Sequence, residues 1–202
     1  MRILVDFDST LTQMDEHMLA TCNERHGTEY AHGDIDSWEW LATFPHASWA
    51  WGDECFGSPE WQASVPPQPG AVRTVRELAM AGDEPYIVSD RTAHTECIRE
   101  WAANHGLGDL PVIISDRNDF PKWKVARGFG IRMAIEDAPH NALDLADKAG
   151  CYPVILIDKP YNRDIDHPRI VRVANWDEVA LVIELAGAVD ARDIWPSEVF
   201  VP

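Results

Sequence analysis

Two aspartates stand two residues apart at the end of the first apolar run of this 202-residue chain. Ile3-Leu4-Val5 is short, apolar and partly β-branched, which is typical of a buried strand of a parallel sheet, and Asp6-Phe7-Asp8 follows it directly. Residues two apart on an extended segment point to the same side, so both carboxylates can face one site. One of them could attack a phosphorus atom while the other moves protons, and both could neighbour a hard cation. A purely structural pair of acids is the alternative, because several other folds also place acids at strand ends.

A hydroxyl and an acid follow a second apolar run. Tyr86-Ile87-Val88 leads into Ser89-Asp90-Arg91-Thr92, after which a helical pattern begins. The free N–H groups at a helix amino terminus attract anions, so Ser89 at this position would suit a phosphate oxygen. The alternative is that Ser89, Asp90 or Thr92 simply caps the helix.

A lysine opens the helix that we predict after Pro121. Lys122 in the first turn is unfavourable to the helix dipole, which indicates another duty, such as balancing the charges of a phosphate and an aspartate. Lys124 competes for this role, and we favour Lys122 because it opens the helix.

Two adjacent acids, Glu136 and Asp137, follow the apolar run Met133-Ala134-Ile135, and a proline-started helix comes next. Neighbouring carboxylates repel one another unless a cation or a hydrogen-bond donor offsets their charge. The alternative is that Asp137 caps the helix and Glu136 is exposed. The order of the four signals carries more weight than any one of them, because each lies at the carboxyl end of a predicted strand or at the start of the next helix.

Strands and helices alternate along most of the chain. Further apolar runs lie at 111–114, 154–157 and 170–173, and helical spacing recurs in four stretches that end near Gly82, Gly106, Gly150 and Gly187. This alternation predicts an α/β fold with right-handed βαβ units and a doubly wound parallel sheet. In such sheets the active site lies at the carboxyl ends of the strands.

The stretch from 14 to 69 breaks the alternation. It contains no convincing strand, ends in a proline-rich linker at 65–70, and holds five of the nine tryptophans, namely Trp38, Trp40, Trp49, Trp51 and Trp61. We interpret it as a small, mainly helical insertion after the first strand. Residues 1–13 and 70–189 then form the α/β core, 14–69 the insertion, and 190–202 a C-terminal tail.

Composition narrows the choice of partners. The 34 acidic and 17 basic residues give a net charge of −17, whose field would repel a nucleic acid polymer. No apolar run approaches the roughly 20 residues of a membrane span, and no signal-peptide core precedes Asp6, so we expect a cytoplasmic protein without a membrane partner. The four cysteines have no Cys-x-x-Cys pair, which indicates reduced thiols. A homodimer is left open.

Together, the four motifs resemble those of the haloacid dehalogenase superfamily. The segment Asp6 to Thr12 resembles its first motif, Ser89 the second, Lys122 the third and Glu136-Asp137 the fourth. More narrowly, 135–141 and 153–162 resemble the branch of 5′-nucleotidases and 5′(3′)-deoxyribonucleotidases. The resemblance implies a Mg²⁺-dependent phosphomonoester hydrolase with a Rossmann-like core. The insertion has the position of the small cap domain that covers the site in this superfamily and selects the substrate.

The resemblance also implies roles for single residues. Asp6 would attack the phosphorus and form an aspartyl-phosphate, and Asp8 would protonate the leaving alcohol and then activate water. The carboxylates of Asp6 and Asp137 and the backbone carbonyl of Asp8 would hold Mg²⁺. Ser89 and Lys122 would hold the transferring phosphoryl group.

Further residues are candidates around this set. Glu136 would neighbour the cation or bind it through water, Lys124, Asp90 and Arg91 stand close in sequence, and Asp90-Arg91 departs from the commonest continuation of the second motif. Aromatic residues stack on nucleobases, so the candidates for substrate contact in the insertion are Trp38, Trp40 and Phe44.

The substrate implied is a nucleoside or deoxynucleoside monophosphate, with a sugar or another small phosphate as the alternative. Two alternatives come from other classes. A receiver-like phosphoacceptor would lack the insertion and the second acid, and the complete set of motifs argues against an inactive ligand-binding module.

Overall fold

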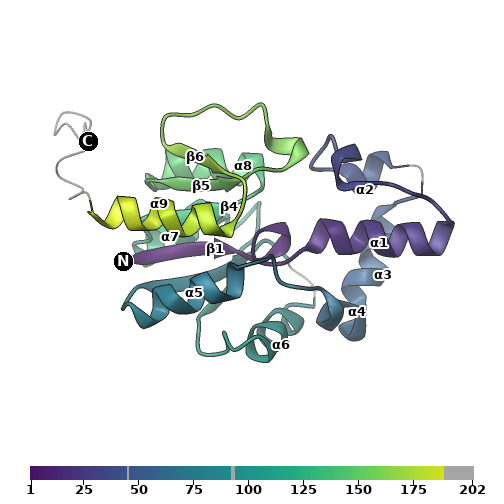
Figure 1. The fold of residues 1–202 in the computed structure, drawn as a ribbon, viewed down its shortest axis with the longest axis horizontal. Coiled ribbons are helices and arrows are strands. Elements are labelled where there is room, and N and C mark those ends of the chain that lie inside the picture. Colours follow the sequence, from purple (N-terminus) through teal and green to yellow (C-terminus); the bar gives the residue numbers. More distant parts are fainter. Residues whose placement is uncertain (45, 92–93, 189–202) are drawn as a thin grey trace.

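The apolar runs of the sequence form a six-stranded parallel sheet with β1 near its centre (Figure 1). The computed structural model describes residues 1–44, 46–91 and 94–188. The strands are β1 (Arg2–Asp6), β2 (Glu84–Ser89), β3 (Val112–Ile114), β4 (Met133–Glu136), β5 (Val154–Ile157) and β6 (Ile170–Val173), in the order β3-β2-β1-β4-β5-β6. The chain builds outward from β1 to β3, returns to β4 beside β1 and builds outward again. The predicted doubly wound α/β fold is therefore confirmed.

Side chains alternate along the strands and build a hydrophobic layer on each face of the sheet. Ile3 and Val5 pack beneath α5 (Ala71–Met80), α6 (Glu96–Asn104) and α9 (Trp176–Ala188). Leu4 packs on the opposite face beneath α7 (Lys122–Phe129) and α8 (Pro139–Asp144), which continues into the π-helical turn η3 (Leu145–Ala149). All three β1 side chains are fully buried. Each contributes about 1.5–3 kcal/mol by leaving water, so the strand that carries Asp6 is firmly held.

The segment 14–69, between β1 and α5, is helical and is called the cap below. It contains α1 (Met14–His26), the 3₁₀ turn η2 (His32–Asp34), α2 (Trp40–Thr43), α3 (Trp49–Gly57) and α4 (Pro59–Ser64). These elements lie beyond the carboxyl ends of the strands (Figure 1). The cap has a hydrophobic cluster separate from the two layers of the core. Thr12 and Pro67 pair as an antiparallel bridge, so the chain enters and leaves the cap at one place. We keep 14–69 as its proposed bounds.

Serine side chains start two of the cap helices. The Oγ atoms of Ser48 and Ser58 accept the backbone N–H groups of Trp51 and Trp61 at 3.1 and 3.2 Å. Each bond satisfies one of the N–H groups that a helix leaves free at its first turn, typically contributing about 1 kcal/mol. These local signals explain why short helices persist in a segment rich in aromatic residues.

A tight turn links β1 to the cap and decides where the first-motif side chains lie. Phe7–Leu11 form the turn η1, in which Asp8 has an extended backbone and Ser9 lies in the left-handed region at φ 61°. Such a conformation in a non-glycine residue costs about 1 kcal/mol or more and persists where the surroundings hold it. Thr12 Oγ1 closes the turn by donating to the carbonyl oxygen of Phe7 at 3.0 Å. The turn buries Ser9 and Thr10 at the carboxyl end of the sheet.

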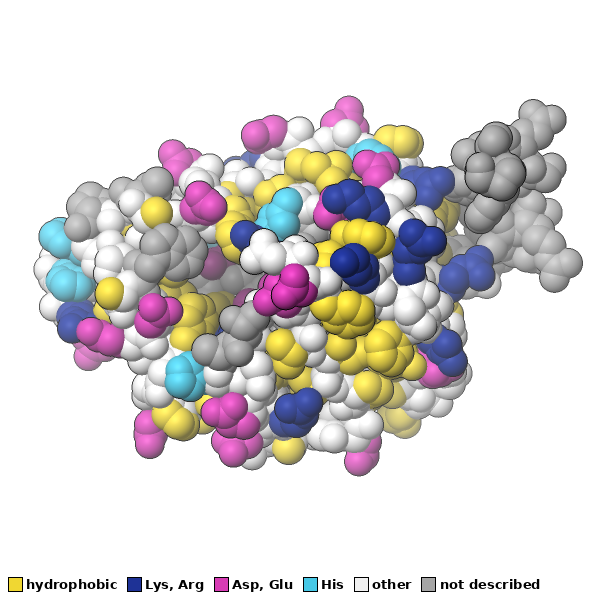
Figure 2. All heavy atoms as spheres, turned by 180° about the vertical axis from the view of Figure 1, so that it is seen from behind, with side chains coloured by type: hydrophobic (Ala, Val, Ile, Leu, Met, Phe, Trp, Pro, Cys, Tyr) yellow, Lys and Arg dark blue, Asp and Glu magenta, His cyan; other side chains and the backbone are white. Residues whose placement is uncertain are grey.

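Charge is unevenly spread over the surface. Figure 2 shows Lys and Arg side chains gathered on the face of the core that α7 and α8 cover, whereas Asp and Glu are scattered. Within the described ranges, no helix combines the length and the apolar character needed to cross a membrane. The predicted tail 190–202 and the alternative of Thr92 as a helix cap lie outside the described residues.

We predict that no cysteine thiol reacts rapidly in the folded protein. Cys22, Cys55, Cys97 and Cys151 are free and buried. Burial raises the pKa of Cys55 to about 11 and that of Cys151 to about 12, so little reactive thiolate is present at pH 8. Ellman's reagent should therefore find none of the four thiols in the native protein and all four in urea. One rapid equivalent in the native protein would contradict the structure.

Candidate active site

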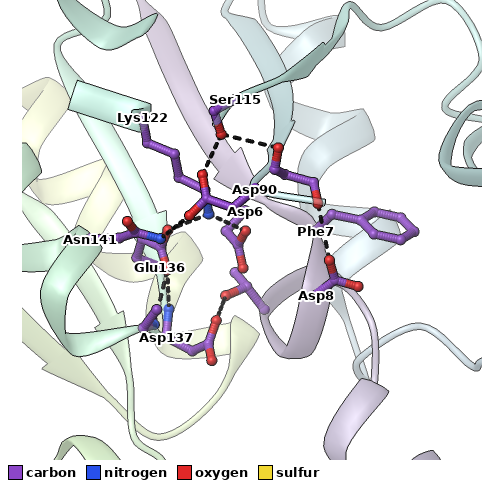
Figure 3. Close-up of polar contacts among 12 residues, drawn as sticks. Asp6, Phe7, Asp8, Asp90, Ser115, Lys122, Glu136, Asp137 and Asn141 are labelled. Carbon is purple, nitrogen blue, oxygen red and sulfur yellow. Dashed lines mark hydrogen bonds and ion pairs between the residues drawn. The ribbon is translucent and has the colours of Figure 1, made fainter. Parts of the chain in front are cut away.

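A buried lysine joins the first and fourth motifs at the end of the sheet. Lys122 opens α7 and is 3% exposed, and its Nζ donates to Asp6 Oδ1 and to Glu136 Oε1, the second at 2.5 Å (Figure 3). Asp6 ends β1 and Glu136 ends the neighbouring β4, so the parallel register brings both to one edge. Lys124 is exposed and donates instead to the backbone oxygen of Asp119 at 2.9 Å. Of the two lysines weighed, the structure brings Lys122 to Asp6.

The buried carboxylates carry more negative charge than this lysine offsets. Burial and the charge of Glu136 raise the pKa of Asp6 well above its usual range, against the effect of Lys122. Burial, followed by Glu136, also raises the pKa of Asp137. Burial lowers the pKa of Lys122, but Asp6 and Glu136 outweigh it and the net shift is upward, so the ammonium stays charged. A further cation would relieve the repulsion among the carboxylates.

The chemistry of these acids fits a hard divalent cation. Asp6, Glu136 and Asp137 are all buried, and one carboxylate oxygen from each lies within 4.8 Å of the others. Oxygen ligands of this kind are those that Mg²⁺ prefers. The carboxylate of Asp137 is already oriented, because Thr10 Oγ1 donates to its Oδ1 at 2.7 Å and Tyr161 Oη to its Oδ2 at 2.5 Å.

The second motif binds the carboxylate of Asp8. Ser89 Oγ donates to Asp8 Oδ2 at 3.0 Å, and the guanidinium of Arg91 pairs with Asp8 Oδ1. Ser89 is fully buried, whereas the Asp8 side chain is 31% exposed. The helix amino terminus predicted beside Ser89 is wrong, because α6 begins only at Glu96. Ser89 Oγ also accepts the N–H of Arg91 at 3.1 Å, so this hydroxyl contacts both Asp8 and Arg91.

Asp90 does not contact Asp8 and instead links the end of β2 to Ser115 and Asn141. Ser115, which follows β3, donates its Oγ to Asp90 at 2.5 Å, and Asn141 on α8 donates its Nδ2 at 2.9 Å (Figure 3). Burial opposes the charge of Asp90, but Lys122 and these two donors lower its pKa on balance. The ionised carboxylate therefore ties the second-motif loop to β3 and to the helix behind the fourth motif.

A cavity of about 240 Å³ lies between these polar groups and the cap. Asp6, Asp8, Lys122 and Asp137 line it from the core, and Arg91 lines it from the second-motif loop. The side contributed by the cap is mostly apolar: Asp15 is joined there by Met14, Met18, Trp38, Trp40, Leu41 and Phe56. The cavity thus joins a charged end to an aromatic end.

Two of the three aromatic residues predicted for substrate contact line this cavity. Trp40 is 3% exposed, and the ring of Trp38 packs edge to face on His140 at 4.9 Å with the Arg117 guanidinium over it at 4.1 Å. Phe44 is absent from the lining residues and packs against the ring of Trp40 inside the cap. Its contact with substrate stays a prediction that this position does not favour.

Several polar residues at the site were not predicted from the sequence. Thr10 contacts Asp137, and Asp15, Asn141 and Tyr161 line the cavity. Thr10 lies two residues after Asp8, so the alternation used for the aspartates could have included it. Tyr161 lies in the segment of nucleotidase resemblance. Asp15 gave no separate signal, because an acid in the first turn of a helix is ordinary.

Comparison with known families agrees with this geometry. Residues 1–192 match the model of the family described as 5′ nucleotidase, deoxy (pyrimidine), cytosolic type C protein. The chain belongs to this family. The match covers both the core and the cap segment.

Two curated relatives match shorter stretches. A nucleotidase of Clostridium acetobutylicum is 43% identical over 63 residues, which are 31% of this chain and 32% of that protein. YqfW of Bacillus subtilis is 32% identical over 94 residues, which are 46% of this chain and 47% of that protein. The chain thus aligns with less than half the length of each of these relatives.

Solved structures share the fold. A HAD family hydrolase from Deinococcus radiodurans, determined with bound phosphate and sodium, superposes with a TM-score of 0.60 at 17% identity, covering 93% of this chain and 96% of that one. At this identity the likeness shows the fold alone. Together with the family match, it confirms the resemblance to the haloacid dehalogenase superfamily and to its nucleotidase branch.

We predict that Lys122→Met destabilises the metal-free protein by about 3 kcal/mol or more, because it leaves Asp6 and Glu136 buried without their cation. Lys124→Met, two residues away on the surface, should change the free energy of unfolding by less than about 0.5 kcal/mol. Urea unfolding in EDTA measures both. Equal effects of the two substitutions would show that the buried ion pairs do not matter to stability.

We predict a pH-dependent cost of burying His140. Burial lowers the pKa of His140 to about 4, whereas an unfolded histidine titrates near about 6.5. Between these values the unfolded chain binds more protons, so the protein loses stability as the pH falls from 6.5 toward 4 and the cost vanishes above that range.

The difference in unfolding free energy between the wild type and His140→Gln should therefore change between pH 6.5 and 4.5 and stay constant above pH 7. The exposed His26→Gln serves as the control. A difference independent of pH for His140→Gln would refute the assignment.

Proposed function

We propose that this chain hydrolyses nucleoside and deoxynucleoside 5′-monophosphates with Mg²⁺, through an aspartyl-phosphate on Asp6. The observation that carries the proposal is the setting of Asp6, a buried carboxylate at the end of the central strand in contact with Lys122 and beside Asp137. It lines a cavity whose other side is apolar and aromatic. Membership of a family described by 5′ nucleotidase activity supports the same substrate class.

Asp6 and Asp8 divide the bond-making and the proton transfers between them. A carboxylate oxygen of Asp6 forms a bond to phosphorus as the bond from phosphorus to the 5′-oxygen breaks, and Asp8 gives its proton to that leaving oxygen. Asp8 then takes a proton from the water that attacks the aspartyl-phosphate, which restores Asp6 and releases phosphate. The contacts of Asp8 with Ser89 and Arg91 hold its carboxylate at the cavity, where the leaving group would lie.

Lys122 would meet the charge on the phosphoryl oxygens, because an ammonium fixed beforehand needs no reorganisation during the reaction. Ser89 donates its one hydroxyl hydrogen to Asp8 and is absent from the cavity lining, so it would have to turn toward the phosphoryl group, and its role there stays a prediction. Asp6, Asp137 and the backbone carbonyl of Asp8 would hold Mg²⁺, which when bound supplies further positive charge to the phosphate. Glu136 positions Lys122, and its role as a water-mediated ligand stays a prediction.

The aromatic end of the cavity supports a nucleotide over a smaller phosphate. Trp38, Trp40 and Phe56 offer flat apolar surface, which suits the face of a nucleobase. A sugar phosphate would leave this surface without a matching group. A substrate panel separates the two alternatives.

We predict that Asp6→Asn lowers phosphate release by on the order of 10³-fold or more, because no other group replaces a lost nucleophile. Phosphate release is measured with ribo- and deoxyribonucleoside 5′-monophosphates, glucose 6-phosphate and p-nitrophenyl phosphate, with Mg²⁺ or with EDTA. Asp166→Asn, an exposed substitution, is the control.

The outcomes separate the parts of the proposal. Activity retained by Asp6→Asn would refute the nucleophile, and activity in EDTA would refute the metal requirement. Preference for glucose 6-phosphate would refute the substrate class. Uptake of phosphate without release would identify the phosphoacceptor alternative.

A further inference from the structure

One tyrosine hydroxyl lies between a core carboxylate and a cap carboxylate. Tyr161 belongs to the 3₁₀ turn η4 (Pro160–Asn162) that follows β5, and its Oη lies 2.5 Å from Asp137 Oδ2 and 2.9 Å from Asp15 Oδ2. Asp15 is in the first turn of cap helix α1. All three side chains are buried. The ring of Tyr161 packs in the hydrophobic cluster of the cap, although its backbone belongs to the core.

The two carboxylates are held in parallel ways. Each has one oxygen on Tyr161, while the other oxygen has a donor of its own side, and Asp15 also has a side-chain hydrogen bond with Ser9 of the core. Thr10 Oγ1 of the core donates to Asp137 Oδ1 at 2.7 Å, and Trp40 Nε1 of the cap donates to Asp15 Oδ1 at 3.3 Å. A phenol carries a single hydrogen, so Tyr161 cannot donate fully to both acids. The interaction at one carboxylate therefore depends on the state of the other.

The neighbours of Tyr161 fix the same segment to both parts of the molecule. Asn162 Nδ2 donates to the backbone oxygens of Asp137 and Ile157, both at 2.8 Å, which holds the turn to the core. Lys159, 3% exposed, donates its Nζ to Glu16 on α1 at 3.0 Å, which holds the turn to the cap. Tyr161 is thus positioned from both sides and has little freedom to turn away from either acid.

We propose that Tyr161 is a positioning residue that couples cation binding at Asp137 to the docking of cap helix α1. The proposal rests on the proposed function, in which Asp137 is a ligand of Mg²⁺. Groups that orient a metal ligand typically contribute 10–100-fold in metal affinity. A cation bound to Asp137 neutralises the negative charge of that carboxylate. The hydrogen of the Tyr161 hydroxyl can then be donated to Asp15, which holds α1 more firmly on the core. Coupling of this kind is reciprocal, so α1 in place also favours the cation.

Mg²⁺ affinity without substrate is the first measurement, made by titration calorimetry on the metal-free protein. Tyr161→Phe keeps the ring in the cap cluster and removes only the hydroxyl, and it should weaken Mg²⁺ binding by about 10–100-fold. Thr10→Val removes the other donor to Asp137 and should weaken binding as well. The control is Tyr86→Phe, because among the described residues the Tyr86 hydroxyl donates only to Glu84, at 3.4 Å. This substitution should leave the affinity unchanged.

Hydrogen exchange of α1 with and without saturating Mg²⁺ is the second measurement, and it separates coupling from simple orientation. Mg²⁺ should protect the α1 amides in the wild type and in Thr10→Val, which keeps the link to the cap. The protection should be lost in Tyr161→Phe even at saturation. Equal affinity, or equal protection of α1, in Tyr161→Phe and the wild type overturns the inference while the proposed function stands. A wild type that binds no Mg²⁺ overturns both.

Discussion

The ammonium of Lys122 lies between the carboxylates of Asp6 and Glu136 with almost no access to water. Burying such charges costs several kcal/mol for each ion unless their partners are held in good geometry. The sheet provides that geometry, because Asp6 and Glu136 end adjacent parallel strands whose side chains are locked between two hydrophobic layers. Lys122 completes it from the first turn of a helix packed on the same sheet. The arrangement holds the carboxylate of Asp6, the proposed nucleophile, in place before any ligand binds.

The same contacts leave an excess of negative charge. Asp6 and Asp137 have raised pKa values because burial comes first and Glu136 adds to it. A site of this kind is stabilised by an added cation or by a phosphate-bound cation more than by a neutral ligand. In the proposed function, the positive charge that a phosphate needs would come from Lys122 and an added cation at this one buried point, although the chain as a whole is acidic.

Residues of the cap and of the core contact one another directly at the buried carboxylates. Arg91 of the core contacts Asp8 and also Gln62 of the cap, and its guanidinium lies 4.6 Å from the ring centre of Phe56. Tyr161 places its ring among cap residues and its hydroxyl on Asp137. A cap joined to Asp8 and Asp137 in this way can exclude water from the cavity, which strengthens every electrostatic interaction inside.

Much of the architecture could be predicted from local patterns. The six apolar runs became the six strands, and the motif residues follow the strands or open the helices as predicted, because hydrophobic period and strand-end position are properties of neighbouring residues. The helix start predicted beside Ser89 was wrong, because α6 begins only at Glu96 and apolar spacing does not set the first residue of a helix. The position of Phe44 away from the cavity could not be foreseen, because composition alone does not say which ring of an aromatic segment faces inward.

The sequence by itself determined the fold class, the family and the four motifs, since these depend on residue type and spacing along the chain. Only the tertiary structure decided which groups touch. Lys122 meets Asp6 across 116 positions, Thr10 meets Asp137 across 127, and Tyr161 meets Asp15 across 146. Contacts at such separations depend on strand register and on how the cap packs on the core. The spacing of neighbouring residues along the chain determines neither of them.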